Sequence, residues 1–270
     1  MKVTHDVHIH TYLSTCCEDA ASTPERIIKT ASDKGLKLIG FADHIWENPK
    51  FKPSEWYRTQ NLEHILKIKR EIPKDTLGVK VLVGCETEYC GNDIIGISRE
   101  AASQLDFVLV PMSHFHMKGF VIPDKDYKSI EVARLMVNYF KGVLKLDIAT
   151  GIAHPFNPLG FRTVDDILNH ISDDEFSECF SMAAEKGVSI EINACIFHEK
   201  SRKIINNYSD ESYIRIFEIA KKSGCMFHFG SDAHTLHHFE ARKDVLDKIS
   251  EKIGIEEKDL SPFIINASAH

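Results

Sequence analysis

Six short groups of histidine and acidic residues occur along this chain, and each group ends an apolar, strand-like run. Imidazole nitrogens and carboxylate oxygens are ligands for divalent metals such as zinc, manganese and iron. The carboxyl ends of neighbouring parallel strands lie at one rim of a sheet or barrel, so we expect the groups to converge there. The pattern predicts a multi-metal hydrolase. The groups are VHIH at 7–10, FADH at 41–44, GCETE at 84–88, PMSHFH at 111–116, IAHP at 152–155 and GSDAH at 230–234.

The residue spacing inside these groups supports a shared site. His8 and His10 are two residues apart, and side chains two apart on a strand project from the same face. Glu86 and Glu88 repeat this spacing, and a buried carboxylate is costly unless it is paired or binds a metal. One such pair is common on protein surfaces, whereas six groups in one register favour metal binding.

The sequence around His154, the histidine of the fifth group, predicts its backbone conformation. His154 precedes Pro155, and proline disfavours the helical region for the residue before it. We therefore expect Pro155 to end the strand and to hold His154 extended. The roles of Glu88 and His116 stay open. The candidate ligands drawn from the six groups are His8, His10, His44, Glu86, His114, His154, Asp232 and His234.

The elements that must position these residues alternate along the chain. Stretches with helical periodicity separate the strand-like runs. Thr23 and Pro24 predict a helix start, and Gly35 predicts its end; Gly187 and Gly224 repeat that ending before later runs. We expect parallel pairing and one α/β domain over 1–270, a (β/α) barrel of about seven repeats. The runs are Val3–Ile9, Leu38–Ala42, Val79–Cys85, Phe107–Pro111, Ile148–Ala153, Val188–Ile192 and Met226–Phe229.

The amino-acid composition indicates which kinds of partner and which cellular compartment to expect. Asp and Glu (40) outnumber Lys and Arg (33), for a net charge of −7, which disfavours nucleic-acid binding. The chain shows neither a signal-peptide pattern nor an apolar stretch long enough to span a membrane. Seven cysteines, an odd number, do not suggest a disulfide framework. We expect a cytoplasmic protein without membrane partners; the oligomeric state is not predicted.

The ordered motifs resemble those of the polymerase and histidinol phosphatase (PHP) superfamily. The resemblance implies a distorted (β/α)7 barrel and a trinuclear site, usually of zinc, iron or manganese, so two or three divalent ions are expected. It also implies that Glu86 bridges two of the metals. The implied ligand sets are His8, His10, Glu86 and Asp232 for one metal, His114 and His154 with Glu86 for a second, and His44 and His234 for the third.

Position 16 departs from the family pattern. Similar phosphatases carry a further histidine six residues after the HxH motif, where this chain has Cys16. A cysteine thiolate is a competent zinc ligand, so Cys16 is our candidate for completing the third metal site. Cys17 and Asp19 are the alternatives if the loop is shifted.

The resemblance also implies a mechanism. A hydroxide bridging two cations would attack a phosphoester, because coordination lowers the pKa of water towards neutrality. Asp232 and a rim histidine, His234, are the candidates for passing a proton to the leaving oxygen.

A phosphate substrate needs cationic groups in addition to the metals. Arg162 follows the HP motif at 154–155, and three further basic residues follow the EIN segment at 191–193, namely Lys200, Arg202 and Lys203. Arginine can bind phosphate oxygens in a bidentate manner. Basic residues on the same two loops contact phosphate in histidinol-phosphatase-like relatives. Lys118 is a weaker candidate.

Glu191 and Asn193 are expected to face the rim, where they hold either the substrate or a metal ligand.

These observations predict a metal-dependent phosphatase that hydrolyses a small phosphate monoester, with histidinol phosphate as the named candidate. One alternative is a nucleotide phosphoesterase or nuclease of the same superfamily. The other is a non-catalytic metal-binding or regulatory module, for which lost ligands would be the signature. Nearly all of the expected ligands are present here.

Overall fold

The computed structural model describes residues 1–197 and 209–268, and within them short parallel strands alternate with helices. The strands form two sheets, ordered β1-β2-β3 and β4-β5-β6-β7-β8. All seven predicted runs contain a strand. The strands are β1 (His5–Ile9), β2 (Leu38–Phe41), β3 (Lys80–Val83), β4 (Cys85–Glu86), β5 (Val108–Pro111), β6 (Gly151–Ala153), β7 (Ser189–Asn193) and β8 (Phe227–Gly230).

Backbone hydrogen bonds connect the two sheets at both of their junctions. On one side, Asp232 N–H donates to the His8 carbonyl at 2.8 Å, and His10 N–H donates to the Ala233 carbonyl at 3.0 Å. On the other side, Glu86 N–H donates to the Asp43 carbonyl at 3.1 Å. The strands therefore follow one another around a ring, which confirms the predicted distorted (β/α)7 barrel.

The distortion is located at Gly84, where the third predicted run divides into β3 and β4. β3 pairs with β2, whereas β4 pairs with β5. A Cβ atom at Gly84 would lie 2.5 Å from the Phe107 carbonyl oxygen and 2.6 Å from the Phe107 ring. Glycine is the residue that fits this close backbone approach, so the change of strand partner depends on it.

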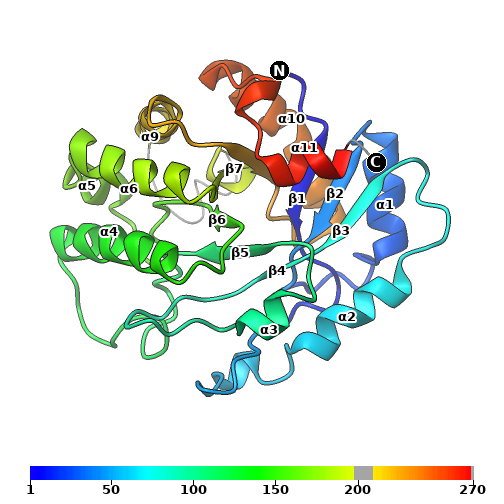
Figure 1. The fold of residues 1–270 in the computed structure, drawn as a ribbon, viewed down its shortest axis with the longest axis horizontal. Helices are drawn as coiled ribbons and strands as arrows, with labels where there is room; N and C mark the ends of the chain where they lie inside the picture. Colours follow the sequence, from blue (N-terminus) through cyan, green and yellow to red (C-terminus); the bar gives the residue numbers. More distant parts are fainter. Residues whose placement is uncertain (198–208, 269–270) are drawn as a thin grey trace.

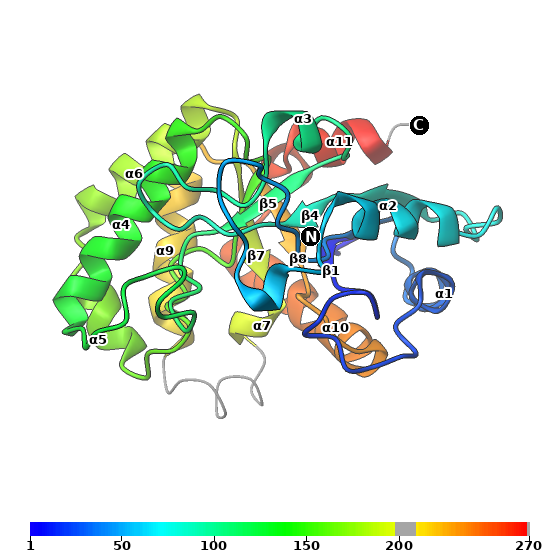
Figure 2. The same cartoon turned by 90° about the horizontal axis from the view of Figure 1, so that it is seen from below.

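Helices cover the outside of the strands. α4, α6 and α9 lie together on one side, and α1 and α2 lie on the opposite side (Figures 1 and 2). The α-helices are α1 (Pro24–Asp33), α2 (Leu62–Glu71), α3 (Arg99–Ala102), α4 (Ser129–Lys145), α5 (Val164–Asn169), α6 (Asp173–Glu185), α7 (Ala194–Phe197), α9 (Asp210–Lys222), α10 (Leu236–Ile253) and α11 (Pro262–Ser268), and the short 3₁₀ helices are η1 (Glu55–Tyr57) and η2 (Glu257–Asp259).

Local sequence sets the ends of these helices as predicted. The Thr23 side chain accepts a hydrogen bond from Arg26 N–H and caps α1, whose first residue is Pro24. Gly35, Gly187 and Gly224 follow α1, α6 and α9 with positive φ angles of 73°, 65° and 82°. Glycine adopts this left-handed conformation without steric cost, so it ends a helix and turns the chain towards the next strand.

The amino ends of the strands lie against α11. Ser261 N–H donates to the Phe227 carbonyl at 2.8 Å, and the Phe263 ring lies 6.0 Å from that of Phe107 and 5.7 Å from that of His228. The opposite, carboxyl end is where the candidate site lies. Among the described residues, we find no helix with the length and apolar content needed to cross a membrane.

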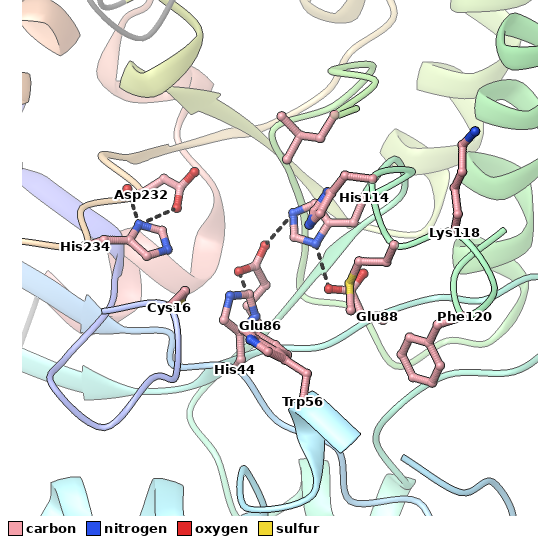
Figure 3. A pocket seen from close by; sticks show the side chains of 13 residues that line it. Cys16, His44, Trp56, Glu86, Glu88, His114, Lys118, Phe120, Asp232 and His234 are labelled. Carbon is pink, nitrogen blue, oxygen red and sulfur yellow. Dashed lines mark hydrogen bonds and ion pairs between the residues drawn. The ribbon is translucent and has the colours of Figure 1, made fainter. Parts of the chain in front are cut away.

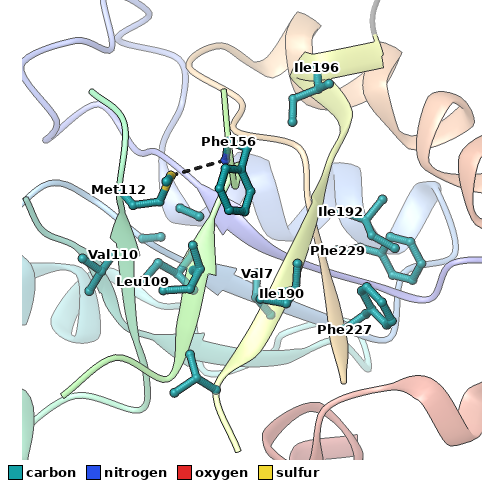
Figure 4. Packing of buried hydrophobic residues seen from close by; sticks show 14 of the residues in the cluster. Val7, Leu109, Val110, Met112, Phe156, Ile190, Ile192, Ile196, Phe227 and Phe229 are labelled. Carbon is teal, nitrogen blue, oxygen red and sulfur yellow. Dashed lines mark hydrogen bonds between the residues drawn. The ribbon is translucent and has the colours of Figure 1, made fainter. Parts of the chain in front are cut away.

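Alternation along the strands divides apolar from polar side chains. In β7, Ile190 and Ile192 belong to the buried apolar core, together with Phe227 and Phe229 of β8 (Figure 4). The intervening Glu191 is also fully buried, yet it contacts His8 rather than the core. Side chains of successive residues point to opposite faces, so β7 packs apolar side chains on one face and presents Glu191 to the barrel interior on the other.

The crowding at Gly84 gives a stability prediction. Gly84→Ala forces a methyl group against the Phe107 backbone, and overpacking of this kind costs roughly 1–3 kcal/mol. We expect the melting temperature, measured by circular dichroism with a chelator present, to fall by roughly 2–10 °C. Gly187→Asn is the control, since space is open there and asparagine tolerates positive φ. Equal melting temperatures for the two variants would contradict this explanation of the strand division.

Candidate metal centre

The predicted ligands lie at the carboxyl ends of the strands. His8 belongs to β1 and Glu86 ends β4. The others follow the end of a strand within four residues. These are His10 after β1, His44 after β2, His114 after β5, His154 after β6, and Asp232 and His234 after β8.

Glu86 lies at the centre of the cluster (Figure 3). Its Oε2 atom is 3.3 Å from His8 Nε2 and 3.3 Å from His44 Nδ1. Its Oε1 atom is 3.0 Å from His154 Nε2 and 3.8 Å from His114 Nε2. The two oxygens of one carboxylate thus face two different sets of imidazoles, which is the arrangement that a bridging ligand requires.

The structure brings all nine candidate ligands into three groups, two of which share His10. Within each group, one ligand atom per residue lies within 4.8 Å of those of the other members. The first ligand group is His8, His10 and Asp232; the second is Glu86, His114 and His154; the third is His10, Cys16, His44 and His234.

The imidazoles converge closely enough to suit shared cations. His8 Nε2 lies 3.2 Å from His10 Nε2, and His114 Nε2 lies 3.2 Å from His154 Nε2. Each pair has a carboxylate beside it, from Asp232 or Glu86. Two imidazole nitrogens with a carboxylate oxygen are a donor set used by zinc, manganese and iron, so the residues fit the metals that the sequence motifs imply.

Buried acceptors orient the ring of each inner histidine. His8 Nδ1 lies 2.7 Å from Glu191 Oε1, and His114 Nδ1 lies 2.6 Å from Glu88 Oε1. A hydrogen bond at Nδ1 leaves Nε2 free to act as a ligand, which is the usual support of metal-binding histidines. Glu88 and Glu191 therefore act in support of the ligands.

Asp43 supports the first strand from a neighbouring segment. Its carboxylate accepts hydrogen bonds from Thr11 N–H at 2.8 Å and from the Ser14 hydroxyl at 2.5 Å. Ser14 Oγ lies in turn 3.2 Å from His10 Nδ1. The aspartate of the DH motif thereby fixes the loop that carries His10 and Cys16.

The electrostatics of the cluster favour positive charge. Burial alone would raise the pKa of Glu86, but His8 and His44 hold that pKa well below its usual range. Burial alone would lower the pKa of His8, but Glu191, Glu86 and Asp232 raise it well above its usual range. Carboxylates that stabilise an imidazolium would equally stabilise a divalent cation in its place.

Despite its burial, the pKa of His114 is raised by Glu88 and Glu86 to about 9, whereas His10 and His44 are set up as neutral ligands. Burial, followed by repulsion from His234, lowers the pKa of His10 to about 4, and burial lowers the pKa of His44 to about 3. A metal ligand must present an unprotonated nitrogen. Neither the His10 ring nor the His44 ring therefore has to release a proton before it binds a metal at neutral pH.

Of the three residues considered for position 16 of the family pattern, Cys16 is the one in a ligand group. The Cys17 thiol donates to the His234 carbonyl at 2.9 Å. The Asp19 carboxylate accepts from the backbone N–H groups of Ala21 and Leu236. The sulfur of Cys17 and the carboxylate of Asp19 thus have structural partners in the loop, whereas Cys16 lines the site.

The expectation of an extended His154 is wrong. Its φ angle is 27°, in the left-handed region, and Asp232 has a φ angle of 52°. Glu191 Oε2 accepts the His154 N–H at 2.5 Å, while buried Arg242 donates to the Ser231 and Asp232 carbonyls. Unfavourable backbone conformations persist where surrounding groups hold them, and they concentrate at functional sites.

The cluster opens into a cavity of about 590 Å³. Lys118 lines this cavity, but its ammonium group donates to the Lys125 carbonyl at 3.0 Å. Arg162 is exposed and is not among the described residues that line the cavity. The other predicted phosphate-binding residues, Lys200, Arg202 and Lys203, lie outside the described residues.

Sequence reasoning missed Tyr57 and the apolar side of the cavity. The Tyr57 hydroxyl donates to Glu88 Oε1 at 2.7 Å and lies 3.5 Å from His44 Nδ1. Trp56, Met117, Phe120 and Leu159 line the cavity beside the ligands. All of them lie outside the six strand-end groups, and a single apolar or aromatic residue in a sequence does not distinguish a site residue from a core residue.

Known proteins resemble this chain over most of its length. A "Probable phosphatase" of Aliivibrio fischeri is 30% identical over 258 residues, covering 95% of this chain and 88% of the relative. A "Probable phosphatase" of Acetivibrio thermocellus is 29% identical over 260 residues, covering 94% of this chain and 89% of the relative.

A solved structure shares the fold. Histidinol phosphate phosphatase from Lactococcus lactis, complexed with zinc, L-histidinol and phosphate, aligns with a TM-score of 0.61 at 16% identity, covering 94% of each chain. The family described as "PHP domain" matches residues 6–195, a range that includes seven of the nine candidate ligands. The chain therefore belongs to the PHP domain family.

Proposed function

We propose that this protein is a metal-dependent phosphatase that hydrolyses the phosphate monoester of a small molecule. The observation that carries the proposal is the Glu86 carboxylate, whose two oxygens face separate imidazole sets at the floor of an open cavity. The names of the relatives support phosphatase activity. The zinc, histidinol and phosphate bound by the Lactococcus protein support both the cofactor and the substrate class.

The ligand groups assign residues to metals. The first group with Glu86 Oε2 would hold one divalent ion, and the second group would hold another through Glu86 Oε1. The third group would hold the third ion. When bound, such metals make a water acidic enough to attack at neutral pH and offset the charge of the phosphate oxygens.

The chain's own residues set up the remaining chemistry. Glu191 and Glu88 hold His8 and His114 with Nε2 towards the cavity floor. Asp232 and His234 line the cavity, and His234 Nδ1 lies 3.0 Å from the Asp232 carbonyl oxygen. A proton on Nδ1 would hold the His234 ring in place. The ring would pass a proton from Nε2 to the leaving oxygen only while that nitrogen binds no metal.

Histidinol phosphate remains the named candidate substrate, on the evidence of the Lactococcus structure's bound product. The net charge of −7 and the engagement of Lys118 with a backbone carbonyl speak against a nuclease. A non-catalytic module is disfavoured because the described residues supply the full set of candidate ligands.

Removal of one ligand tests the proposed activity. Purified protein loaded with manganese or zinc should release phosphate from p-nitrophenyl phosphate, and excess chelator should abolish the release. His154→Ala should lower kcat/KM by at least roughly 100-fold while the far-ultraviolet circular dichroism stays unchanged. His170→Ala, which alters an exposed histidine after α5, is the control. Wild-type turnover by His154→Ala would refute the assignment of that residue.

The third ligand group gives a test that does not depend on activity. Cobalt(II)-loaded protein should show a thiolate-to-cobalt charge-transfer absorption, because Cys16 lies with three imidazoles in that group. Cys16→Ser should remove the band and lower the metal content by one ion per chain. Cys17→Ser, whose thiol donates to a backbone carbonyl, should retain both. A band that persists in Cys16→Ser would rule out this ligand.

A further inference from the structure

The cavity above the ligands has an apolar wall, which consists of Trp56, Met117, Phe120 and Leu159. These side chains come from η1 and from two loops that follow β5 and β6. All four are partly exposed rather than buried in the core. Large apolar side chains that line a concave site beside a few polar groups are typical of a small-molecule binding site.

Packing fixes the aromatic members of the wall in place. The Trp56 ring contacts Tyr57 edge-on at 4.6 Å and His44 at 5.1 Å. The Phe120 ring lies 4.8 Å from that of Trp46 and 5.9 Å from that of Tyr57. Tyr57 is buried and bonded to Glu88, so the wall and the metal ligands share one rigid support. A preformed surface of this kind binds a ligand with little ordering cost.

Charge distribution separates the wall from the floor. The carboxylates that line the cavity, Glu86, Glu88 and Asp232, all lie within the ligand network. Lys118 is the one lysine or arginine among the described residues that line the cavity, and its ammonium bonds to the Lys125 carbonyl. The wall therefore offers apolar contact and no described cation for a second phosphate.

We infer that the substrate is a phosphate monoester of an alcohol that carries a single aromatic or similarly apolar group. The inference rests on the proposed phosphatase function and specifies its substrate. The phosphate would lie over the ligand groups, and the apolar group would pack between Trp56 and Phe120. The cavity volume of about 590 Å³ falls within the usual range for small ligands.

Two esters of primary alcohols test the inference. 2-Phenylethyl phosphate and glycerol 3-phosphate present the same kind of bond for hydrolysis and differ in the group that would meet the wall. We expect the metal-loaded protein to show a kcat/KM roughly 10–100-fold higher for 2-phenylethyl phosphate, since apolar contacts discriminate at this level. Equal values, or a preference for glycerol 3-phosphate, would overturn the inference and leave the phosphatase function standing.

Substitutions in the apolar wall test whether these side chains cause the preference for the aromatic ester. Trp56→Ala and Phe120→Ala should lower the ratio of kcat/KM for 2-phenylethyl phosphate to kcat/KM for glycerol 3-phosphate by at least roughly tenfold. Trp56→Phe retains an aromatic ring and should keep most of the preference. Ile130→Ala removes an apolar side chain that is 44% exposed on α4 and serves as the control. Equal losses for both esters would count against a wall contact.

A binding measurement tests the wall without any turnover. The chain has two tryptophans; Trp46 is 5% exposed, so the fluorescence of Trp56 should report on the cavity. In chelator-treated protein, 2-phenylethanol should change the emission saturably, and glycerol should not. Such binding without phosphate release from either ester would support the apolar site and defeat the proposed phosphatase function. Absence of a saturable change would overturn the apolar site.

Discussion

The structure depends on keeping a carboxylate charged inside the barrel. Glu86 is 1% exposed, and an isolated buried carboxylate would take up a proton because low polarity disfavours its charge. Positive or polar groups must therefore surround it from several directions. The imidazoles of His8, His44, His114 and His154 do so, and they come from four different strand ends. The Glu86 carboxylate therefore constrains the positions of those four strand ends.

The same constraint explains why the strands are apolar on their outer face. Along β1, Val7 and Ile9 belong to the core, while Asp6, His8 and His10 face the interior. The helices supply the apolar surface against which the outer faces pack, and apolar residues of β2, β5 and β6 are buried as well. This arrangement leaves the interior available for polar groups, at the cost of satisfying each of them with a partner.

Local sequence patterns made much of the fold and of the candidate site predictable. Ligand groups follow strands in sequence, and parallel strands bring their ends together, so the convergence of His8, Glu86 and Asp232 required no long-range information. The division of a run at Gly84 was not predictable, because it depends on Phe107 pressing against that position. The conformation of His154 depends likewise on Glu191, and in this case a tertiary hydrogen bond overrides the local effect of Pro155.

The three ligand groups differ in chemistry, and the difference follows from their position. The second group includes Glu86, and a carboxylate beside imidazoles suits hard or borderline metals. The third lies towards the loop after β1, where Cys16 joins three imidazoles and no carboxylate belongs to the set. Sulfur and nitrogen donors favour zinc over manganese. One cavity therefore has two kinds of ligand group on its floor, and its apolar wall stands beside them. Under the proposed function, selection of the metals and selection of the organic substrate would rest on separate residues, because the ligand groups and the apolar wall share no side chain.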